Sequence, residues 1–250
     1  MVQAVILAGG KGKRIGTETV QNYEALLEIG GRPMLSFVVA ALQKSRYIEK
    51  IFIAGPCEKL QMFAGKQIQL LEGGKHLLET MQKVYDRIGE VKRVVVLTTD
   101  IPFLTTAALD DFLAQCEGKT GDFFYPVIEK RDVQQTYPEA QRTYVKLTDG
   151  VFTGGNVVVM NMEILPRCKT FALQVMQNRK KPWRIISLLG WRILLRFLFQ
   201  RLSTENICTY ISEKLNMQGV VIFSKYPELG MDIDKKSDYK IAKNYLSINE

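Results

Sequence analysis

The chain has 250 residues, of which 46% are hydrophobic and 24% are charged, a composition typical of globular proteins with an apolar core. It contains no run of about 18 uncharged apolar residues, which excludes a transmembrane helix. Four scattered cysteines and a single histidine argue against a zinc site and favour a reduced, cytoplasmic protein. The formal net charge of +8 indicates either a generally basic surface or an anionic partner such as a nucleotide, a nucleic acid or an anionic lipid.

In the first half of the chain, short apolar runs alternate with segments of helical periodicity. Strands are predicted at 2–7, 50–54, 67–71 and 93–98. Helices are predicted at 33–44, 77–88 and 105–115, the last capped by Thr105 or Thr106. Continuous β-branched strands flanked by helices indicate a parallel sheet that is covered on both faces.

The second half is less regular. Extended segments are predicted at 122–129, 142–147, 156–160 and 220–223. Helices are predicted at 163–177, 204–215 and 237–245, the second capped by Ser203 or Thr204. We interpret residues 1–250 as a single domain, with a helical insertion at 169–218.

A glycine-rich loop follows the first strand directly and reads LAGGKGKRIG over residues 7–16. Glycines let the backbone turn sharply and present N–H groups to an anion. Lys11, Lys13 and Arg14 add positive charge, and a guanidinium can bind phosphate oxygens in a bidentate manner. The loop therefore predicts a triphosphate site, although a tight strand-to-helix turn would also use these glycines.

Acidic side chains occur at two further places. Asp100 follows a buried strand, where ligand sites of α/β proteins form, although a turn or helix-capping aspartate is an alternative. Asp232 and Asp234 alternate in a stretch predicted to be extended, so we expect them to point to opposite faces and only one to share a metal ion with Asp100. The alternative is a solvated turn in which Asp234 or Ser237 caps the last helix.

Four segments resemble the GT-A-type nucleotidyltransferases, including the MobA-like group named for the molybdenum-cofactor guanylyltransferase. The loop is similar to that family's LAGGxGxRMG signature. The other three segments read ALLEIGGRPMLSFVVAAL (25–42), VVVLTTDIPFLT (94–105) and GMDIDKKSDYKIA (230–242). The resemblance covers about residues 1–165 and 218–245 and keeps the family's motif order.

This resemblance implies a three-layer α/β/α, Rossmann-like GT-A fold with a mainly parallel central sheet. It implies that Lys13 and Arg14 hold the triphosphate as catalytic residues, and that Asp100 and Asp234, with Asp232 as the alternative, hold Mg²⁺ or Mn²⁺. Further nucleotide contacts are expected from Leu7, Ala8, Gly9, Gly10, Lys11, Gly12, Gly74 and Thr99. Gly155 and Asn156 are the expected acceptor contacts, and plain turns are the alternative at Gly74 and Asn156.

One position departs from the family pattern. Where the family carries a lysine before the ALLEIGG stretch, this chain has Glu24, which would repel phosphates. Lys11, Lys13 or Lys66 could compensate for the lost charge. Alternatively, Glu24 faces away or pairs with Arg14 or Arg32, or the chain is a non-catalytic relative that binds nucleotide.

Residues 179–201 hold seven basic residues, no acidic residue and both tryptophans of the chain. Read as a helix, they place Arg184, Arg192 and Arg196 within about 120° of one another on an otherwise apolar surface. Such a helix would pack on the domain as a lid or in a homodimer, or would contact an anionic membrane or a hydrophobic phosphorylated acceptor. No nucleic-acid-binding module is recognisable.

The sequence thus predicts an enzyme that transfers a nucleoside monophosphate from a triphosphate to a phosphorylated or hydroxyl-bearing small molecule. Pyrophosphate would be released, and the reaction would depend on Mg²⁺. Two alternatives remain: a glycosyltransferase that uses a nucleotide-sugar donor, and a degenerate protein that binds nucleotide without turnover.

Overall fold

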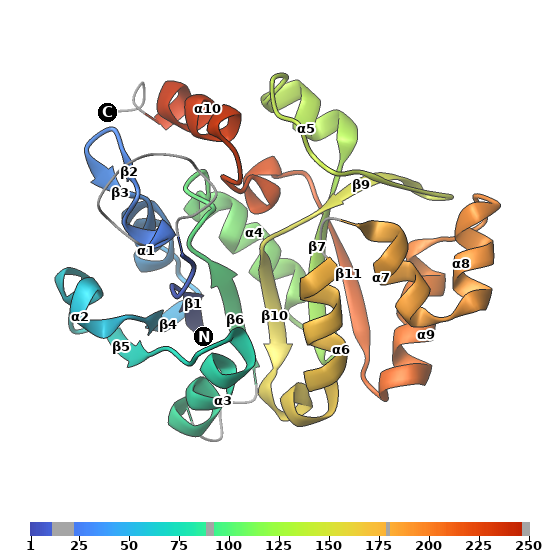
Figure 1. Ribbon diagram of the computed structural model, residues 1–250, viewed down its shortest axis with the longest axis horizontal. Coiled ribbons are helices and arrows are strands. Elements are labelled where there is room, and N and C mark those ends of the chain that lie inside the picture. Colours follow the sequence, from blue (N-terminus) through green and yellow to red (C-terminus); the bar gives the residue numbers. More distant parts are fainter. Residues whose placement is uncertain (12–22, 89–92, 179–180, 247–250) are drawn as a thin grey trace.

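The computed structural model describes residues 1–11, 23–88, 93–178 and 181–246 (Figure 1). Its centre is a nine-stranded sheet in the order β5-β4-β1-β6-β10-β7-β9-β8, with β11 on the other edge of β7. The strands are β1 (Val2–Leu7), β4 (Ile48–Gly55), β5 (Ile68–Glu72), β6 (Arg93–Thr98), β7 (Phe123–Glu129), β8 (Val145–Leu147), β9 (Gly150–Gly154), β10 (Val157–Asn161) and β11 (Gly219–Ser224). A separate hairpin joins β2 (Glu28–Ile29) to β3 (Arg32–Pro33).

The sheet is mixed, but most strands share one direction. β5, β4, β1 and β6 form a parallel block, and β7 and β11 are parallel to each other. β10 lies between the two blocks and runs antiparallel to both β6 and β7, while β9 also opposes β7. The predicted mainly parallel sheet is confirmed, and β10 and β9 are the strands that reverse direction.

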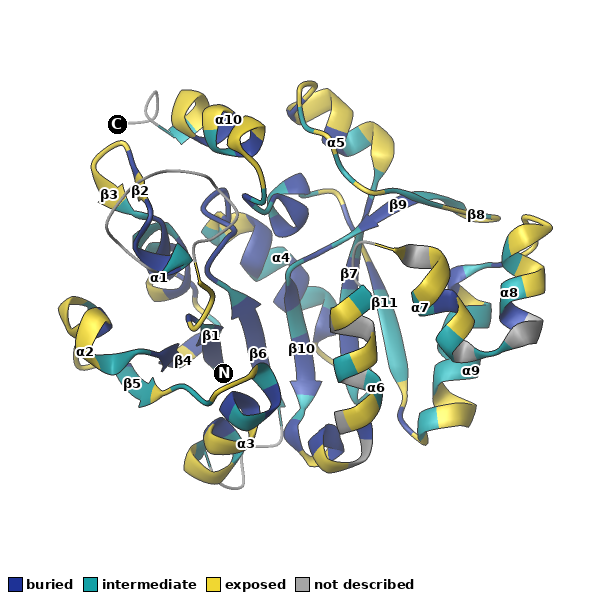
Figure 2. Ribbon diagram, in the orientation of Figure 1, coloured by how far each residue is buried: buried dark blue, intermediate teal, exposed yellow. Residues whose placement is uncertain are grey.

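Helices cover both faces of the sheet, as predicted for a three-layer α/β/α fold. Ala4 and Ile6 of β1 face a core closed by α1 (Met34–Gln43), α4 (Thr106–Cys116) and α10 (Lys236–Leu246). Val5 faces the opposite core, closed by α3 (Leu77–Ile88), α6 (Leu165–Asn178) and α9 (Thr204–Leu215). Figure 2 shows the buried strands between these helices. Because both faces are covered, both sets of alternating side chains are apolar.

Local capping sets the start of two helices. The Thr105 hydroxyl oxygen accepts a hydrogen bond from the backbone N–H of Ala108 (3.1 Å) and begins α4. Ser203 and Asn206 form a reciprocal capping box that begins α9. In each case the first of the two predicted cap residues is the one used.

The region between β10 and β11 is mainly helical within its described length. The amphipathic pattern of residues 179–201 was interpreted as one helix, and this interpretation is wrong. Gly190 separates two helices, α7 (Pro182–Leu189) and α8 (Trp191–Leu198). Its φ of 127° is unfavourable for residues other than glycine. A small separate core of Ile186, Ile193 and Leu202 supports α7 and α8. Within the described ranges, every helix is too short or too polar to cross a lipid bilayer.

Several short elements carry no strong sequence signal. They are α2 (Cys57–Leu60), α5 (Lys130–Thr136) and the single-turn helices η1 (Glu24–Leu26), η2 (Gln61–Phe63), η3 (Met162–Ile164) and η4 (Pro227–Gly230). Two of them matter for the site. η1 follows the glycine-rich loop, and η4 leads into the segment that carries Asp232 and Asp234.

Candidate functional site

The site lies where β1 and β6 end. These strands are parallel neighbours, with Leu7 paired to Thr98, so the residues that follow them emerge at the same edge of the sheet. Ala8 is buried, and its N–H donates to the carbonyl of Ala54 (2.7 Å). Gly9, Gly10 and Lys11 are exposed beyond this anchor. The predicted residues Gly12, Lys13 and Arg14 lie outside the described part of the chain.

Glu24 lies against the glycine-rich loop. Its backbone N–H donates to the carbonyl of Gly10 (3.0 Å). A Cβ added at Gly10 would come within 2.6 Å of the Glu24 Oε2, so the carboxylate fills the space that glycine leaves open. Of the explanations considered for Glu24, the one in which it faces away from the loop is therefore wrong. The negative charge sits beside the predicted triphosphate cradle.

Three carboxylates converge next to this loop. One oxygen from each of Asp100, Asp232 and Asp234 lies within 4.8 Å of the others, and Asp100 is only 6% exposed. The expectation that Asp232 and Asp234 point to opposite faces is wrong. They follow η4 in an irregular segment, where the alternation of a strand does not apply.

Two sets of backbone hydrogen bonds shape that segment. The N–H of Ile233 donates to the carbonyl of Asp100 (2.8 Å), which ties the C-terminal segment to the end of β6. The Asp238 carboxylate accepts from the N–H groups of Asp234 (3.1 Å) and Lys235 (3.0 Å). Asp238, in the first turn of α10, thus ties the segment before the helix to the helix start.

Arg142 is a site residue that the sequence analysis missed. Its guanidinium forms an ion pair with the Asp232 carboxylate and also donates to the Asp232 carbonyl (2.9 Å). The Arg142 side chain is 8% exposed. It lies before β8, in a segment predicted to be extended throughout, and its partner is distant in sequence, so no local pattern indicated the pair.

Tyr125 of β7 is the second missed residue. Its hydroxyl occupies the space beside Gly154, where any Cβ would clash with it. Burial, and to a lesser extent the Asp232 carboxylate, raises the pKa of Tyr125 to about 12. Tyr125 therefore stays a neutral phenol near the acidic cluster at physiological pH.

The predicted acceptor residues form the tight turn between β9 and β10. The N–H of Gly155 donates to the carbonyl of Pro126 (2.9 Å), and the N–H of Asn156 donates to the carbonyl of Leu229 (2.7 Å). A Cβ at Gly155 would meet the Pro126 ring at 2.6 Å. Gly155 is thus required by packing, and an acceptor contact from the Asn156 side chain stays a prediction.

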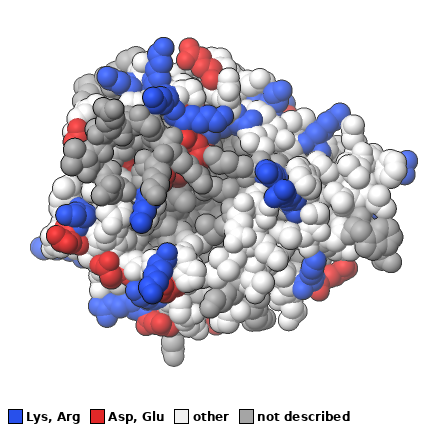
Figure 3. Space-filling view, viewed as in Figure 1, with Lys and Arg blue, Asp and Glu red and all other residues white. Residues whose placement is uncertain are grey.

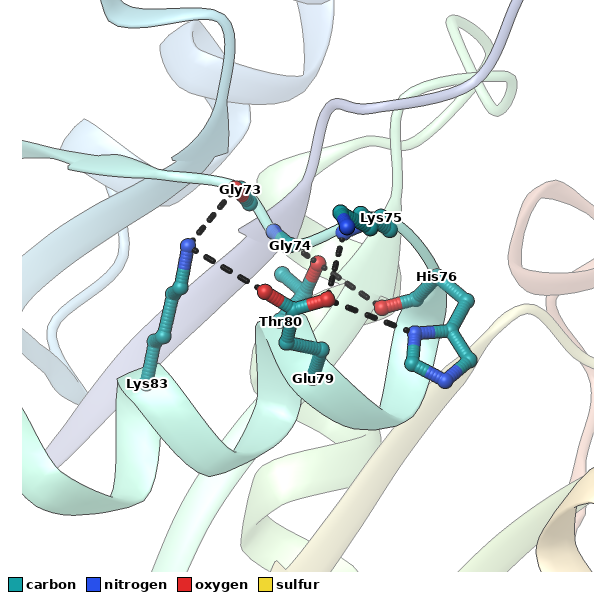
Figure 4. A network of polar contacts seen from close by, with 7 residues as sticks. All are labelled: Gly73, Gly74, Lys75, His76, Glu79, Thr80 and Lys83. Atoms are coloured by element: carbon teal, nitrogen blue, oxygen red, sulfur yellow. Dashed lines mark hydrogen bonds and ion pairs between the residues drawn. The ribbon is translucent and has the colours of Figure 1, made fainter.

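Gly74 belongs to a network that holds the loop after β5 onto α3 (Figure 4). Its N–H donates to the Thr80 hydroxyl (2.9 Å), and the N–H of Lys75 donates to Glu79 (2.8 Å). The hydrogen bond from the Lys75 backbone N–H is the main cause that lowers the pKa of Glu79. Because Thr80 already accepts from the N–H of Gly74, the predicted nucleobase contact cannot use that group without breaking this bond.

Thr98 is the last residue of β6, and Thr99 follows it directly. Thr99 is 3% exposed. The hydroxyl oxygen of Thr98 is buried and has no hydrogen-bond partner among the described residues. A buried hydroxyl without a partner is costly unless a ligand or water satisfies it. Thr98 is therefore a further candidate for nucleotide contact, one residue before the predicted Thr99.

The acidic cluster has the donor set of a site for a hard divalent cation. Mg²⁺ and Mn²⁺ prefer carboxylate oxygens, and Mg²⁺ is bound by one or two carboxylates together with substrate phosphates. Asp100 and Asp234 supply such oxygens, while Asp232 already engages Arg142. The glycine-rich loop at the same sheet edge would bring phosphates beside them.

Comparison with known proteins identifies the family. The sequence pattern that defines the MobA-like NTP transferase domain matches residues 4–187. The chain belongs to the MobA-like NTP transferase family. The predicted family and its nucleotidyltransferase class are thereby confirmed.

Among curated relatives, 2-C-methyl-D-erythritol 4-phosphate cytidylyltransferase of Clostridium perfringens (strain SM101 / Type A) is 27% identical over 118 residues, which are 44% of this chain and 51% of that protein. The corresponding protein of Frankia casuarinae is 28% identical over 116 residues, 45% of this chain and 42% of that protein. The chain thus spans about half the length of the curated relatives it matches.

Solved structures match over nearly the whole chain. A hypothetical transferase from Thermus thermophilus superimposes with a TM-score of 0.80 at 30% identity, covering 95% of this chain and 99% of that one. A CMP:2-keto-3-deoxy-manno-octonic acid synthetase complexed with CTP gives a TM-score of 0.61 at 11% identity, covering 100% of both chains. The second likeness shows the fold alone, and it confirms the predicted α/β class.

Proposed function

We propose that this protein transfers a nucleoside monophosphate from a nucleoside triphosphate to a small acceptor that carries a phosphate or hydroxyl group. The observation that carries the proposal is the convergence of Asp100, Asp232 and Asp234 at the sheet edge where the glycine-rich loop begins. Carboxylates beside a phosphate-binding loop are the arrangement that metal-assisted nucleotidyl transfer needs.

In this proposal Asp100 and Asp234 hold Mg²⁺ or Mn²⁺, and Arg142 positions Asp232 next to them. The bound ion would neutralise negative charge on the α-phosphate. The loop N–H groups and Lys11 would bind the other phosphates. Lys13 and Arg14 remain predicted contributors to the same task.

The reaction needs no covalent protein intermediate. An acceptor oxygen forms a bond to the α-phosphorus while the bond from that phosphorus to the bridging oxygen of the β-phosphate breaks, so that pyrophosphate leaves. Most of the rate enhancement would come from positioning and from electrostatic stabilisation of the phosphates. CTP is the first triphosphate to test, because the named relatives are cytidylyltransferases and the synthetase structure holds CTP.

The test measures thermal stabilisation by ATP, CTP, GTP and UTP, each with and without Mg²⁺. A ligand that binds only the folded state raises the melting temperature by mass action. We expect a Mg²⁺-dependent shift with one triphosphate, lost in Asp100→Asn and kept in the exposed control Asp86→Asn. Pyrophosphate release with candidate acceptors then reports turnover. An Asp100→Asn protein that keeps the Mg²⁺-dependent shift contradicts the assignment.

A second candidate function has a specific observation in its favour. Glu24 places its carboxylate against Gly10, where a triphosphate would meet it. Unless a cation such as Arg14 or Arg32 neutralises it, this carboxylate would repel the phosphates, which favours a protein that binds nucleotide weakly and does not turn it over. Nucleotide binding without pyrophosphate release, whichever acceptor is added, would support this candidate. Release of a nucleoside diphosphate from a nucleotide sugar, without pyrophosphate, would instead indicate a glycosyltransferase.

A further inference from the structure

The end of α8 exposes large apolar side chains to solvent. Leu195, Leu198 and Phe199 are 41%, 64% and 72% exposed, and Trp183 of α7 is 52% exposed. Leu195, Leu198 and Phe199 are spaced by three and four residues, so they lie next to one another on one side of the helix. Side chains of this size seldom gather on the surface of a soluble protein without a partner.

These apolar side chains are not an unfilled part of the core. Ile193, on the inner side of α8, is 1% exposed and packs with Ile186 and Leu202. Leu194 and Phe197 are partly buried against the same core. α8 therefore has a packed inner side and a second apolar side that faces outwards.

Cations flank this outward side in the sequence, while Glu213 of α9 lines a hollow together with Leu195 and Arg196. Lys181, Arg184, Arg196 and Arg201 are exposed, and none of them forms an ion pair with any other residue that the structure describes. No aspartate or glutamate occurs between Glu163 and Glu205. Figure 3 shows a largely uncharged surface over this helical region, with lysine and arginine side chains and one acidic patch at its edges.

We propose that the α8 tip, defined as Leu195, Arg196, Leu198, Phe199 and Arg201, binds the surface of an anionic lipid bilayer. Its apolar side chains would enter the boundary between headgroups and acyl chains, while the arginines contact lipid phosphates. Charge complementarity selects this partner. In a symmetric dimer through the same tip, the arginines of the two copies would face each other, which disfavours a second copy.

The binding is peripheral, because α8 has only eight residues and would lie at the interface. Two separate contributions are required, since short apolar insertions and isolated charge patches each bind bilayers only weakly. Loss of either the apolar or the cationic side chains should therefore release the protein. This requirement distinguishes the proposal from general adsorption of a basic protein.

The test is flotation of the full chain with vesicles of phosphatidylcholine alone, or with about 30 mol% phosphatidylglycerol. We expect binding only to the anionic vesicles, falling as salt shortens the Debye length. Leu198→Ser with Phe199→Ser, and separately Arg196→Gln with Arg201→Gln, should each lower partitioning at least about tenfold.

Matched controls lie at the other end of the molecule, around α2 (Figure 1). Met62 is 71% exposed, and Lys59 and Lys66 are also exposed. Met62→Ser and the pair Lys59→Gln with Lys66→Gln should leave flotation unchanged. Unchanged melting temperatures would show that all variants are folded.

Intrinsic fluorescence supplies a second readout, because the two tryptophans of the chain are Trp183 and Trp191. Binding to anionic vesicles should shift the tryptophan emission to shorter wavelength and reduce its quenching by acrylamide. Equal binding to neutral and anionic vesicles, or an equal loss in the α2 controls, would overturn the proposal. The proposal would also be overturned if the wild-type protein were a dimer that floats with neither kind of vesicle and became monomeric on Leu198→Ser with Phe199→Ser. The α8 tip would then be a dimer interface.

Discussion

Arg142 and Asp232, 90 residues apart in the sequence, form a nearly buried ion pair at the acidic cluster, reinforced by a hydrogen bond from the arginine to the Asp232 carbonyl (2.9 Å). The double contact fixes both the side chain and the backbone of Asp232. It therefore holds the irregular segment before α10 in the conformation that brings Asp234 next to Asp100. Arg142 acts through this segment as a positioning residue.

Arg142→Gln should lower the free energy of unfolding by about 2–3 kcal/mol, because it leaves the partly buried Asp232 carboxylate without this cation. Urea denaturation measures this loss. If the cluster holds a divalent cation, millimolar Mg²⁺ should recover more stability in the variant than it adds to the wild type. Na⁺ at the same ionic strength should not.

The control for that variant is Arg131→Gln. Arg131 pairs with Glu129 at 2.9 Å, but its side chain is 76% exposed. An exposed pair contributes less than about 1 kcal/mol, so this change should be small and insensitive to Mg²⁺. Similar losses in both variants would contradict the special role of Arg142.

Asp232→Asn and Asp234→Asn should differ in kind. Asp232 engages Arg142, so its replacement should mainly reduce stability without ligand. Asp234 lies in the same cluster, and its replacement should reduce the affinity for Mg²⁺ in the presence of nucleotide by at least about tenfold. Replacing a residue that only hydrogen-bonds a metal ligand already has an effect of that size. Mg²⁺ titrations followed by nucleotide-dependent thermal shift separate the two effects, and equal behaviour of the two variants would contradict the division.

Most of the fold could be predicted because its signals are local. The buried strands 2–7 and 93–98 and the capped helices after Thr105 and Ser203 depend on short apolar runs and neighbouring polar groups. The break at Gly190 could not be predicted with the same rule, since the helical pattern continues across it. The backbone conformation there depends on how α7 and α8 pack on their own small core.

The candidate site could be predicted only in part. The glycine-rich loop and Asp100 follow apolar strands directly, so each has a local signal. The pairing of Arg142 with Asp232 and the placing of Tyr125 join distant segments and have none. The prediction for Asp232 and Asp234 was wrong because it assumed an extended strand. The segment is instead shaped by the hydrogen bond from the Ile233 N–H to the Asp100 carbonyl.

Glu24→Lys should strengthen triphosphate binding. The Glu24 carboxylate lies beside Gly10 of the loop, and replacing a negative by a positive charge near phosphates should lower the dissociation constant at least about tenfold. Isothermal titration with CTP and the other triphosphates at two salt concentrations measures the change. Glu28→Lys makes the same charge change at an exposed position of β2 and should have little effect. Unchanged affinity in Glu24→Lys would show that the carboxylate does not oppose the nucleotide.

Glu228, in η4 close to the acidic segment, should destabilise the protein at neutral pH. Burial is the main cause that raises the pKa of Glu228 above its ordinary value of 4.5, and its Oε2 has no hydrogen-bond partner among the described residues. With a raised pKa in the folded state, the contribution to stability is full below pH 4.5 and is lost as the pH rises through the folded pKa. Glu228→Gln, which stays uncharged, should therefore have a higher melting temperature than the wild type at pH 7.

The pH dependence tests the cause of that effect. The gain in melting temperature from Glu228→Gln should shrink as the pH falls towards 4.5, because the wild-type carboxyl then becomes neutral as well. Glu139→Gln removes an exposed carboxylate and should change the melting temperature little at either pH. A gain that is the same at both pH values would mean that packing of the amide, and not the charge of Glu228, is responsible.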